Sequence, residues 1–280
     1  MWDHLNIIFS NCPFNLHGKI RDHFTKMSQI TSQNAENNSV SLFPQWRRRI
    51  RNIISKYPSL YLPLARGRLP DAYLISAQTE IVIEGFPRCA NSFAEAAFRI
   101  SQPHAVPMAH HAHAAAQVIA GIRRHIPTLV LFRDPEEAVR SLLMLRPHIY
   151  SAYDGFREYL TFYETVMPYR ADFVLSSFQG TTKSFDKVIR RVNERFETDF
   201  VEFENTEEKI KRAYEMVDQL SHTRVGPKNV DYSLFLDAEH HTRRKKMQAA
   251  VHDLLNAKAA VEPRREAQEL FERMRVTADC

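Results

Sequence analysis

The chain has 280 residues, of which 44% are apolar and 25% are charged, and its formal net charge is +5. This composition predicts a globular protein with one large core, and the small basic excess argues against a general nucleic-acid-binding surface. No apolar window approaches the roughly 18 residues that a membrane-spanning helix needs, and the first residues do not resemble a secretory signal.

The three cysteines, Cys12, Cys89 and Cys280, are far apart and odd in number. Their spacing supports neither a disulfide framework nor a zinc site, so we expect a reducing, cytoplasmic location. The sequence does not indicate an oligomeric state.

The N-terminal segment, residues 1–44, is polar over much of its length and is predicted to be a mobile arm or linker. Residues 45–66 then place Trp46, Ile50 and Ile53 at helical spacing until Pro58, which predicts a short amphipathic helix against the core. The basic run from Arg47 to Arg51 on this helix is interpreted as a solvated face. A single domain is expected over residues 45–280.

Short apolar runs alternate with helical patterns from residue 71 onward, which predicts βαβ units and a mostly parallel central sheet flanked by helices, an α/β fold. The nucleotide-binding core is expected over about 71–200, followed by a helical part over about 205–280. The predicted strands are 71–77, 80–85, 128–132 and 172–178. The predicted helices are 94–100, 111–125, a helix opening at 134–137, 152–167, 184–196, 206–220, 238–255 and 265–274.

A candidate anion-binding loop, Glu84 to Phe93, joins the strand 80–85 to the helix that follows it. Ligands of parallel α/β sheets bind beyond the carboxyl ends of the strands, and a helix N-terminus directs backbone N–H groups at an anion. Arg88 adds a permanent charge, and Asn91 and Ser92 add side-chain donors. The chain has no Walker A pattern, which disfavours ordinary phosphotransfer from ATP or GTP. The alternative is an ordinary turn with a chance arginine.

A second candidate site follows the strand 128–132. Arg133 stands at the end of this strand, and Ser141 lies about two turns into the next helix, whose start Asp134 is expected to cap. A guanidinium and a hydroxyl can converge there on one tetrahedral anion. Alternatively, Arg133 pairs locally with Asp134 or Glu137, and Ser141 is an ordinary helix residue.

Together the two motifs resemble those of the sulfotransferase family over roughly residues 78–200. Pro87-Arg88-Cys89-Ala90-Asn91-Ser92-Phe93 is similar to the 5′-phosphosulfate loop, and Arg133-Asp134-Pro135 through Ser141 is similar to the 3′-phosphate motif. The loop departs from the family pattern because Cys89 and Ala90 replace the usual small pair and Asn91 replaces a hydroxyl residue. The resemblance implies a P-loop-like fold and a PAPS-dependent sulfotransferase, where PAPS is 3′-phosphoadenosine-5′-phosphosulfate, with no metal.

The resemblance also implies site residues. Arg88 would neutralise the leaving phosphate, and Arg133 and Ser141 would anchor the 3′-phosphate; the loop residues Arg88, Cys89, Ala90, Asn91, Ser92 and Phe93 would surround the 5′ side. A general base is expected among the histidines between the motifs. His111 is preferred, then His110 and His113, with Glu84 and Glu95 as alternatives. A metal at His110 and His113 lacks a third ligand in the sequence.

The acceptor is expected to be a small molecule or a carbohydrate, bound by the aromatic stretch 145–170 and the C-terminal helices. Basic C-terminal residues, Arg224, Lys228 and the Arg243–Lys246 run, are candidates for closing over the nucleotide. Two other functions stay open: a non-catalytic nucleotide-binding descendant of the family, and a nucleotide-dependent phosphotransferase.

Overall fold

A computed structural model describes residues 42–145, 150–225 and 251–280 of the chain. Within them, Phe43–Cys280 forms one compact unit. The predicted arm up to residue 41 lies outside the described residues. So do Lys228 and the run Arg243–Lys246, which were predicted to close over a nucleotide.

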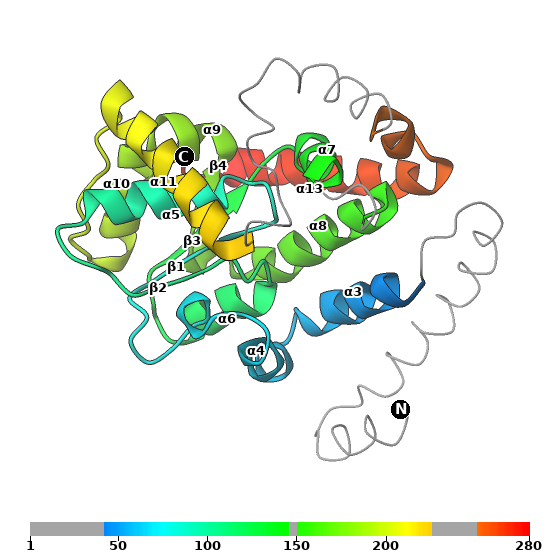
Figure 1. Ribbon diagram of the computed structural model, residues 1–280, viewed down its shortest axis with the longest axis horizontal. Coiled ribbons are helices and arrows are strands. Elements are labelled where there is room, and N and C mark those ends of the chain that lie inside the picture. The colour runs from blue at the N-terminus through cyan, green and yellow to red at the C-terminus, as the bar shows by residue number, and fades with distance from the viewer. Residues whose placement is uncertain (1–41, 146–149, 226–250) are drawn as a thin grey trace. The chain divides into compact units, whose positions relative to one another are not determined.

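Four strands form one sheet in the order β2-β1-β3-β4, and every neighbouring pair is parallel. In register, Ile83 faces His110, Gly85 faces Leu131 and Phe132 faces Ser177. Helices lie on both sides of this sheet (Figure 1). The predicted α/β class with a parallel sheet is therefore confirmed. The strands are β1 (Ile81–Gly85), β2 (Met108–His110), β3 (Thr128–Phe132) and β4 (Val174–Ser177).

Two strand predictions differ from the structure. The segment 71–77 contains a single turn of 3-10 helix, Asp71–Tyr73, and no strand. Its apolar residues Leu74 and Ile75 are buried beside α4 (Pro58–Arg66) and α6 (Ala115–Arg123). The Ile75 N–H donates to Gln117 Oε1 instead of to a neighbouring strand. Strand β2 was not predicted, because three residues are too few to show a period.

The predicted helices are present in the described residues with shifted bounds, and α9 (Phe178–Lys183) was not predicted. The helix predicted from His111 begins at Ala115, because His111 and His113 have φ angles of 58° and 49° that a right-handed helix excludes. The helices are α3 (Leu42–Ile54), α4 (Pro58–Arg66), α5 (Asn91–Ser101), α6 (Ala115–Arg123), α7 (Pro135–Leu145), α8 (Ala152–Val166), α9 (Phe178–Lys183), α10 (Phe185–Phe196), α11 (Glu207–Val225) and α13 (Val261–Thr277).

The two faces of β1 pack against different helices, because successive side chains of a strand point to opposite faces. Ile81 and Ile83 belong to the large apolar core together with Phe98 of α5. Val82 belongs to a smaller core formed by α4 and α6. Burial on both faces explains why β1 and β3 read as continuous apolar runs.

The C-terminal part is helical where the structure describes it: α11, residues 251–255 and α13. Helix α11 extends five residues beyond its predicted end and packs on α5, where the rings of Tyr214 and Phe93 lie 5.3 Å apart. Helix α13 packs on α7 and α8. Among the described helices, none combines the length and the apolar character that crossing a membrane requires.

The basic run on α3 is not a solvated face where its side chains are described. Arg48 and Arg49 pair with Glu158 and Asp154 of α8 at 3.5 and 3.1 Å, and the Arg48 side chain is only 10% exposed. Arg51 reaches further into the fold and donates to the carbonyl oxygen of Ala112. These contacts attach α3 to α8 and to the turn at residues 111–113, here named the histidine turn.

Candidate functional site

The two predicted motifs meet at the carboxyl end of the sheet. From β1 the chain passes to β2 on one side and then to β3 on the other, so the topological switch lies between β1 and β3. The loops that follow these two strands are therefore neighbours, and a crevice between such loops is where open α/β sheets bind ligands. The fold defines the class: an α/β protein whose strands β1 and β3 are each followed by a loop and a helix at the carboxyl end of a parallel sheet.

The first loop has an unusual backbone. Arg88 and Ala90 adopt φ angles of 72° and 70°, in the left-handed region that normally favours glycine. Ala90 is also the residue before α5, so its backbone turns the chain into the helix. Asn91 follows, buried, and its Nδ2 donates to the Phe86 carbonyl oxygen at 3.0 Å. Its Oδ1 is buried without a hydrogen-bond partner.

The side chains of the two motifs touch. Arg88 Nε donates to Ser141 Oγ at 2.8 Å, and Arg133 Nη1 donates to the Arg88 carbonyl oxygen at 3.3 Å. Arg133 also pairs with Glu137 at 3.0 Å, and its guanidinium lies 4.1 Å from the centre of the Phe178 ring. The local Arg133–Glu137 pair, the alternative that the sequence left open, is thus present. Ser141 contacts Arg88, and the convergence of Arg133 and Ser141 on one anion stays a prediction.

Asp134 caps α7 as predicted from the sequence, because its Oδ1 accepts from the Glu137 N–H at 3.0 Å. Helix α7 starts directly after β3, and its Ser141 bonds Arg88 of the first loop. Ser141 thereby faces the first loop.

Two of the predicted loop residues belong to the core. Cys89 is fully buried and Phe93 is 4% exposed, so only their backbone groups are available to a ligand at this loop. Burial raises the pKa of the Cys89 thiol to about 12, which keeps it protonated near neutral pH and excludes a thiolate nucleophile. Tyr163 lies next to Cys89 and donates to the Leu131 carbonyl oxygen at 2.6 Å.

The histidines of the segment 104–113 separate into different environments. His111 is beside the loop, where its Nε2 lies 3.1 Å from Ser92 Oγ. His110 is buried at the end of β2, with its Nδ1 2.7 Å from His111 Nδ1. His113 Nδ1 bonds the Gly85 carbonyl oxygen at 2.8 Å, and His104 is exposed. Of the predicted bases, His111 is thus nearest to the loop hydroxyl.

Glu84 forms hydrogen bonds to the backbone of the histidine turn. Its carboxylate accepts from the N–H groups of Ala112 and His113 at 2.7 and 3.1 Å and from Gln117 Nε2 at 2.8 Å. Burial raises the pKa of this carboxyl to about 7, against the effect of its hydrogen-bond donors. Through these hydrogen bonds Glu84 stabilises the conformation of the histidine turn.

Two further residues hold the histidine turn, and their role could not be predicted from the sequence. Arg51 and Tyr61 both donate to the Ala112 carbonyl oxygen, at 2.9 and 3.0 Å. They come from α3 and α4, far from the motifs in the sequence, and neither belongs to a recognisable pattern. Only the position of Glu84 next to the loop was a sequence signal.

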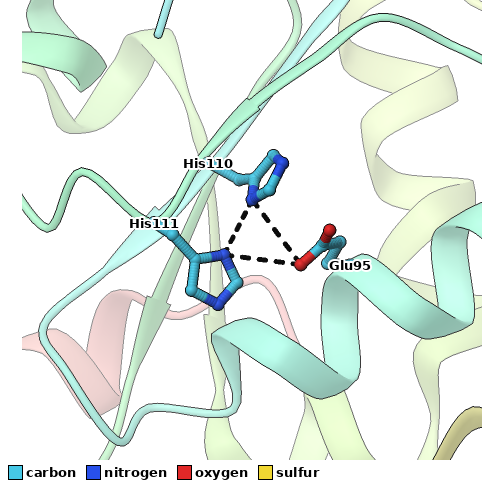
Figure 2. A group of neighbouring side chains, drawn as sticks. All are labelled: Glu95, His110 and His111. Atoms are coloured by element: carbon cyan, nitrogen blue, oxygen red, sulfur yellow. Dashed lines mark hydrogen bonds and ion pairs between the residues drawn. The ribbon is translucent and has the colours of Figure 1, made fainter. Parts of the chain in front are cut away.

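Glu95, His110 and His111 form a compact group (Figure 2). One carboxylate oxygen and one ring nitrogen from each histidine lie within 4.8 Å of one another. These atoms have the chemistry of metal ligands. The pair considered in the sequence, His110 and His113, is not the one that the structure brings together, because His113 bonds the Gly85 carbonyl oxygen and His111 lies beside His110.

A cavity of about 630 Å³ lies at the start of α7, on the side of α13. Its lining includes Asp134 and Glu136 from the second motif and Arg264 and Gln268 from α13. None of the residues of the first loop lines it. The cavity therefore borders the candidate site without containing its arginines.

Comparisons with known proteins give little further information. No protein-family model and no curated protein sequence matches the chain. Among solved structures, the chain is similar to mouse sulfotransferase SULT7A1 complexed with PAP, with 14% identity and a TM-score of 0.35 over 74% of this chain and 88% of that one. A similarity at this identity and TM-score does not indicate a function for the chain.

Proposed function

We propose that the chain binds PAPS between the loops that follow β1 and β3 and transfers its sulfuryl group to an acceptor hydroxyl or amine. The observation that carries the proposal is the Arg88–Ser141 hydrogen bond of 2.8 Å, together with the contact of Arg133 with the Arg88 carbonyl oxygen. Two motifs separated in sequence thereby touch, and they bring two guanidinium groups to the carboxyl end of the sheet.

The charges of this crevice suit a nucleotide with phosphates at both ends. Arg133 and Ser141 would hold the 3′-phosphate, because a guanidinium fork and a hydroxyl together match a tetrahedral anion. The first turn of α5 would offer its backbone N–H groups and Ser92 Oγ to the 5′ side. Arg88, between the two, would turn from Ser141 toward the bridging phosphate oxygen.

The proposed reaction breaks the bond between sulfur and the bridging oxygen of the 5′-phosphate and forms a bond between sulfur and the acceptor atom. Adenosine 3′,5′-bisphosphate leaves, and Arg88 balances the charge that develops on its phosphate. The acceptor proton passes to His111 Nε2, which lies beside Ser92. His110 would support the ring of His111 through the contact between their Nδ1 atoms.

The acceptor belongs to this proposal only as a class. A small molecule or a carbohydrate with a nucleophilic hydroxyl or amine would have to approach His111. The ring of Tyr73 lies 4.6 Å from the ring of His110 and 6.2 Å from that of His111, so an apolar or sugar face could pack beside it.

The first test is the thermal stability of the purified protein with adenosine 3′,5′-bisphosphate, because a ligand that binds only the native state raises the melting temperature. We expect a rise with the bisphosphate, a much smaller one with ATP, and roughly 10- to 100-fold weaker binding for Arg133→Ala, the effect of losing a charge-assisted bond. Arg140→Ala is the matched control, since Arg140 is exposed on α7.

No rise at millimolar bisphosphate, or equal rises with ATP, would contradict the proposal. Binding without consumption of PAPS in the presence of varied acceptors would instead support a non-catalytic nucleotide-binding protein. One observation favours that second function: the loop lacks the glycines typical of the family, and Arg88 and Ala90 stand in left-handed conformations instead.

A further inference from the structure

The group formed by Glu95, His110 and His111 brings three atoms with the chemistry of metal ligands close together. The Nδ1 atoms of the two histidines are 2.7 Å apart. Glu95 Oε2 lies 3.5 Å from each of these nitrogens. Figure 2 shows the three side chains pointing toward a common centre. The carboxylate oxygen is therefore equidistant from both rings and outside normal hydrogen-bond distance of either.

These separations are close to those of ligands around one metal ion. Nitrogen and carboxylate ligands bind Zn²⁺ at about 2.0–2.2 Å, which puts neighbouring ligands of a tetrahedral ion about 3.3 Å apart. The two carboxylate–nitrogen separations fit, and the two nitrogens would have to move apart by about half an ångström. Two histidines with one carboxylate are also a known set of ligands for catalytic zinc and for non-haem iron.

The surroundings hold these three ligands in place. Arg99 Nε donates to Glu95 Oε1 at 3.1 Å, which orients the carboxylate and leaves Oε2 toward the rings. Ser92 Oγ lies next to His111 Nε2, the nitrogen that a metal on Nδ1 would leave protonated. Glu95 and His110 are each 1% exposed, and the His111 side chain is 12% exposed. The site is thus buried, with an opening at His111.

One contact is unfavourable with or without an ion. Arg99 Nη2 lies 3.4 Å from His110 Nε2. In the proposed transfer His111 Nε2 is unprotonated and accepts a proton, so His111 Nδ1 donates to His110 Nδ1, and His110 carries its proton on Nε2, opposite a group that can only donate. A metal on both Nδ1 atoms leaves the His110 proton on Nε2. The Arg99 side chain is 37% exposed and can turn that end toward water while it keeps its bond to Glu95.

We propose that Glu95, His110 and His111 bind a divalent transition-metal ion of the Zn²⁺ class, with at least one coordination position open. The sequence predicted no metal, and the proposed sulfuryl transfer requires none. A consequence, which rests on that proposed function, follows from the tautomer: metal-bound His111 carries its proton on Nε2 and cannot accept the acceptor's proton there. The metal-loaded protein is then expected to lose transfer.

The test uses the full chain, stripped with a chelator and titrated with Co²⁺, whose visible absorption reports a four- or five-coordinate site. We expect one equivalent of Co²⁺ to bind, to be displaced by Zn²⁺, and to bind more than about 10-fold more weakly in Glu95→Gln and His111→Asn. The control His104→Asn removes an exposed histidine outside the group and should bind as the parent does.

The melting temperature of each stripped variant shows whether it folds; if Glu95→Gln does not, the partly exposed His111→Asn carries the comparison. Absence of the cobalt spectrum at millimolar metal would overturn the proposal. A spectrum that neither variant changes would also overturn it.

The stripped protein titrated with adenosine 3′,5′-bisphosphate separates this proposal from the proposed function. Cobalt binding without a bisphosphate shift supports the metal site and contradicts the transferase. A bisphosphate shift without cobalt binding does the reverse.

Discussion

Glu84 is a fully buried carboxyl, and both of its oxygens accept hydrogen bonds from N–H groups. The N–H groups of Ala112 and His113 approach from the histidine turn, and Gln117 approaches from α6. The turn keeps His111 and His113 in left-handed conformations, which cost free energy unless the surroundings fix them. Glu84 therefore stabilises the backbone that presents His111 to the first loop.

We expect Glu84→Gln to lower the free energy of unfolding by about 1–3 kcal/mol, because an amide NH₂ would replace one acceptor and face another donor. Urea unfolding at neutral pH measures this change. Glu80→Gln, an exposed change directly before the same strand, should be nearly neutral. Equal stability of the two variants would mean that the turn does not depend on the Glu84 acceptors.

At the residue scale, the residues of the two motifs could be selected from the sequence, whereas most residues that hold the motifs in position could not. Arg88, Ser141 and Arg133 could be selected because loops after parallel strands have a defined place in the fold. Arg51, Tyr61 and Arg99 could not, because their roles depend on contacts between elements far apart in the chain. His110 and Glu95 were noted separately, but their approach to each other depends on where β2 lies.

At the element scale, α3 and α8 meet through charges that are largely removed from water. Arg48 pairs with Glu158 at 3.5 Å, and Glu158 Oε1 has no hydrogen-bond partner. Burial raises the pKa of Glu158 to about 7, against the effect of Arg51 and Arg48. The folded state therefore binds this proton more tightly than the unfolded chain, in which the carboxyl has its ordinary pKa of 4.5.

A carboxyl with a raised pKa in the folded state makes stability fall as pH rises through the window between the two pKa values. From about pH 4.5 to pH 7, Glu158 is expected to lower the free energy of unfolding by on the order of 3 kcal/mol, a loss that Glu158→Gln removes. Urea unfolding across this range compares the two chains. The pKa of Glu84 is also raised, but Glu84 is present in both chains, so its effect cancels in the comparison. The control is Glu164→Gln, because Glu164 is exposed on the same helix. Parallel pH profiles for parent and Glu158→Gln would contradict the assignment.

Element prediction succeeded where the pattern was long and failed where tertiary contacts decided. The strands β1 and β3 and the helices α7, α8 and α10 agree because continuous apolar runs and helical periods are local signals. The segment 71–77 has apolar residues that pack without pairing, so composition alone could not distinguish it from a strand. Helix α6 starts later than predicted because His111 and His113 have positive φ angles, and a sequence of histidines and alanines gives no signal of such angles.

At the scale of the whole molecule, the order β2-β1-β3-β4 brings the two motifs together. The sequence predicted the succession of strands and helices, but the order of strands across the sheet is a long-range property. At the point where β1 and β3 run side by side, a Cβ on Gly85 would overlap the Leu131 carbonyl oxygen. Glycine is therefore required there for the close approach of the two strands.

We expect Gly85→Ala to destabilise the protein by roughly 1–3 kcal/mol through backbone displacement, and to weaken binding of adenosine 3′,5′-bisphosphate because the first loop moves away from the second. Thermal melting with and without the bisphosphate measures both effects. Gly67→Ala is the matched control, because a Cβ there meets nothing within 4 Å. Unchanged melting and binding in Gly85→Ala would show that the sheet adapts without affecting the crevice.

The parallel sheet also has a kinetic consequence. In each of its three pairings, the partner strands are separated along the chain by at least one helix, so no ladder begins as a hairpin. Loop closure must precede every pairing, which predicts slow folding dominated by non-local contacts. Because β1 pairs with both β2 and β3, a chain that has not yet brought these three strands together leaves edges open, and refolding at high concentration should lose material to aggregation before the crevice forms.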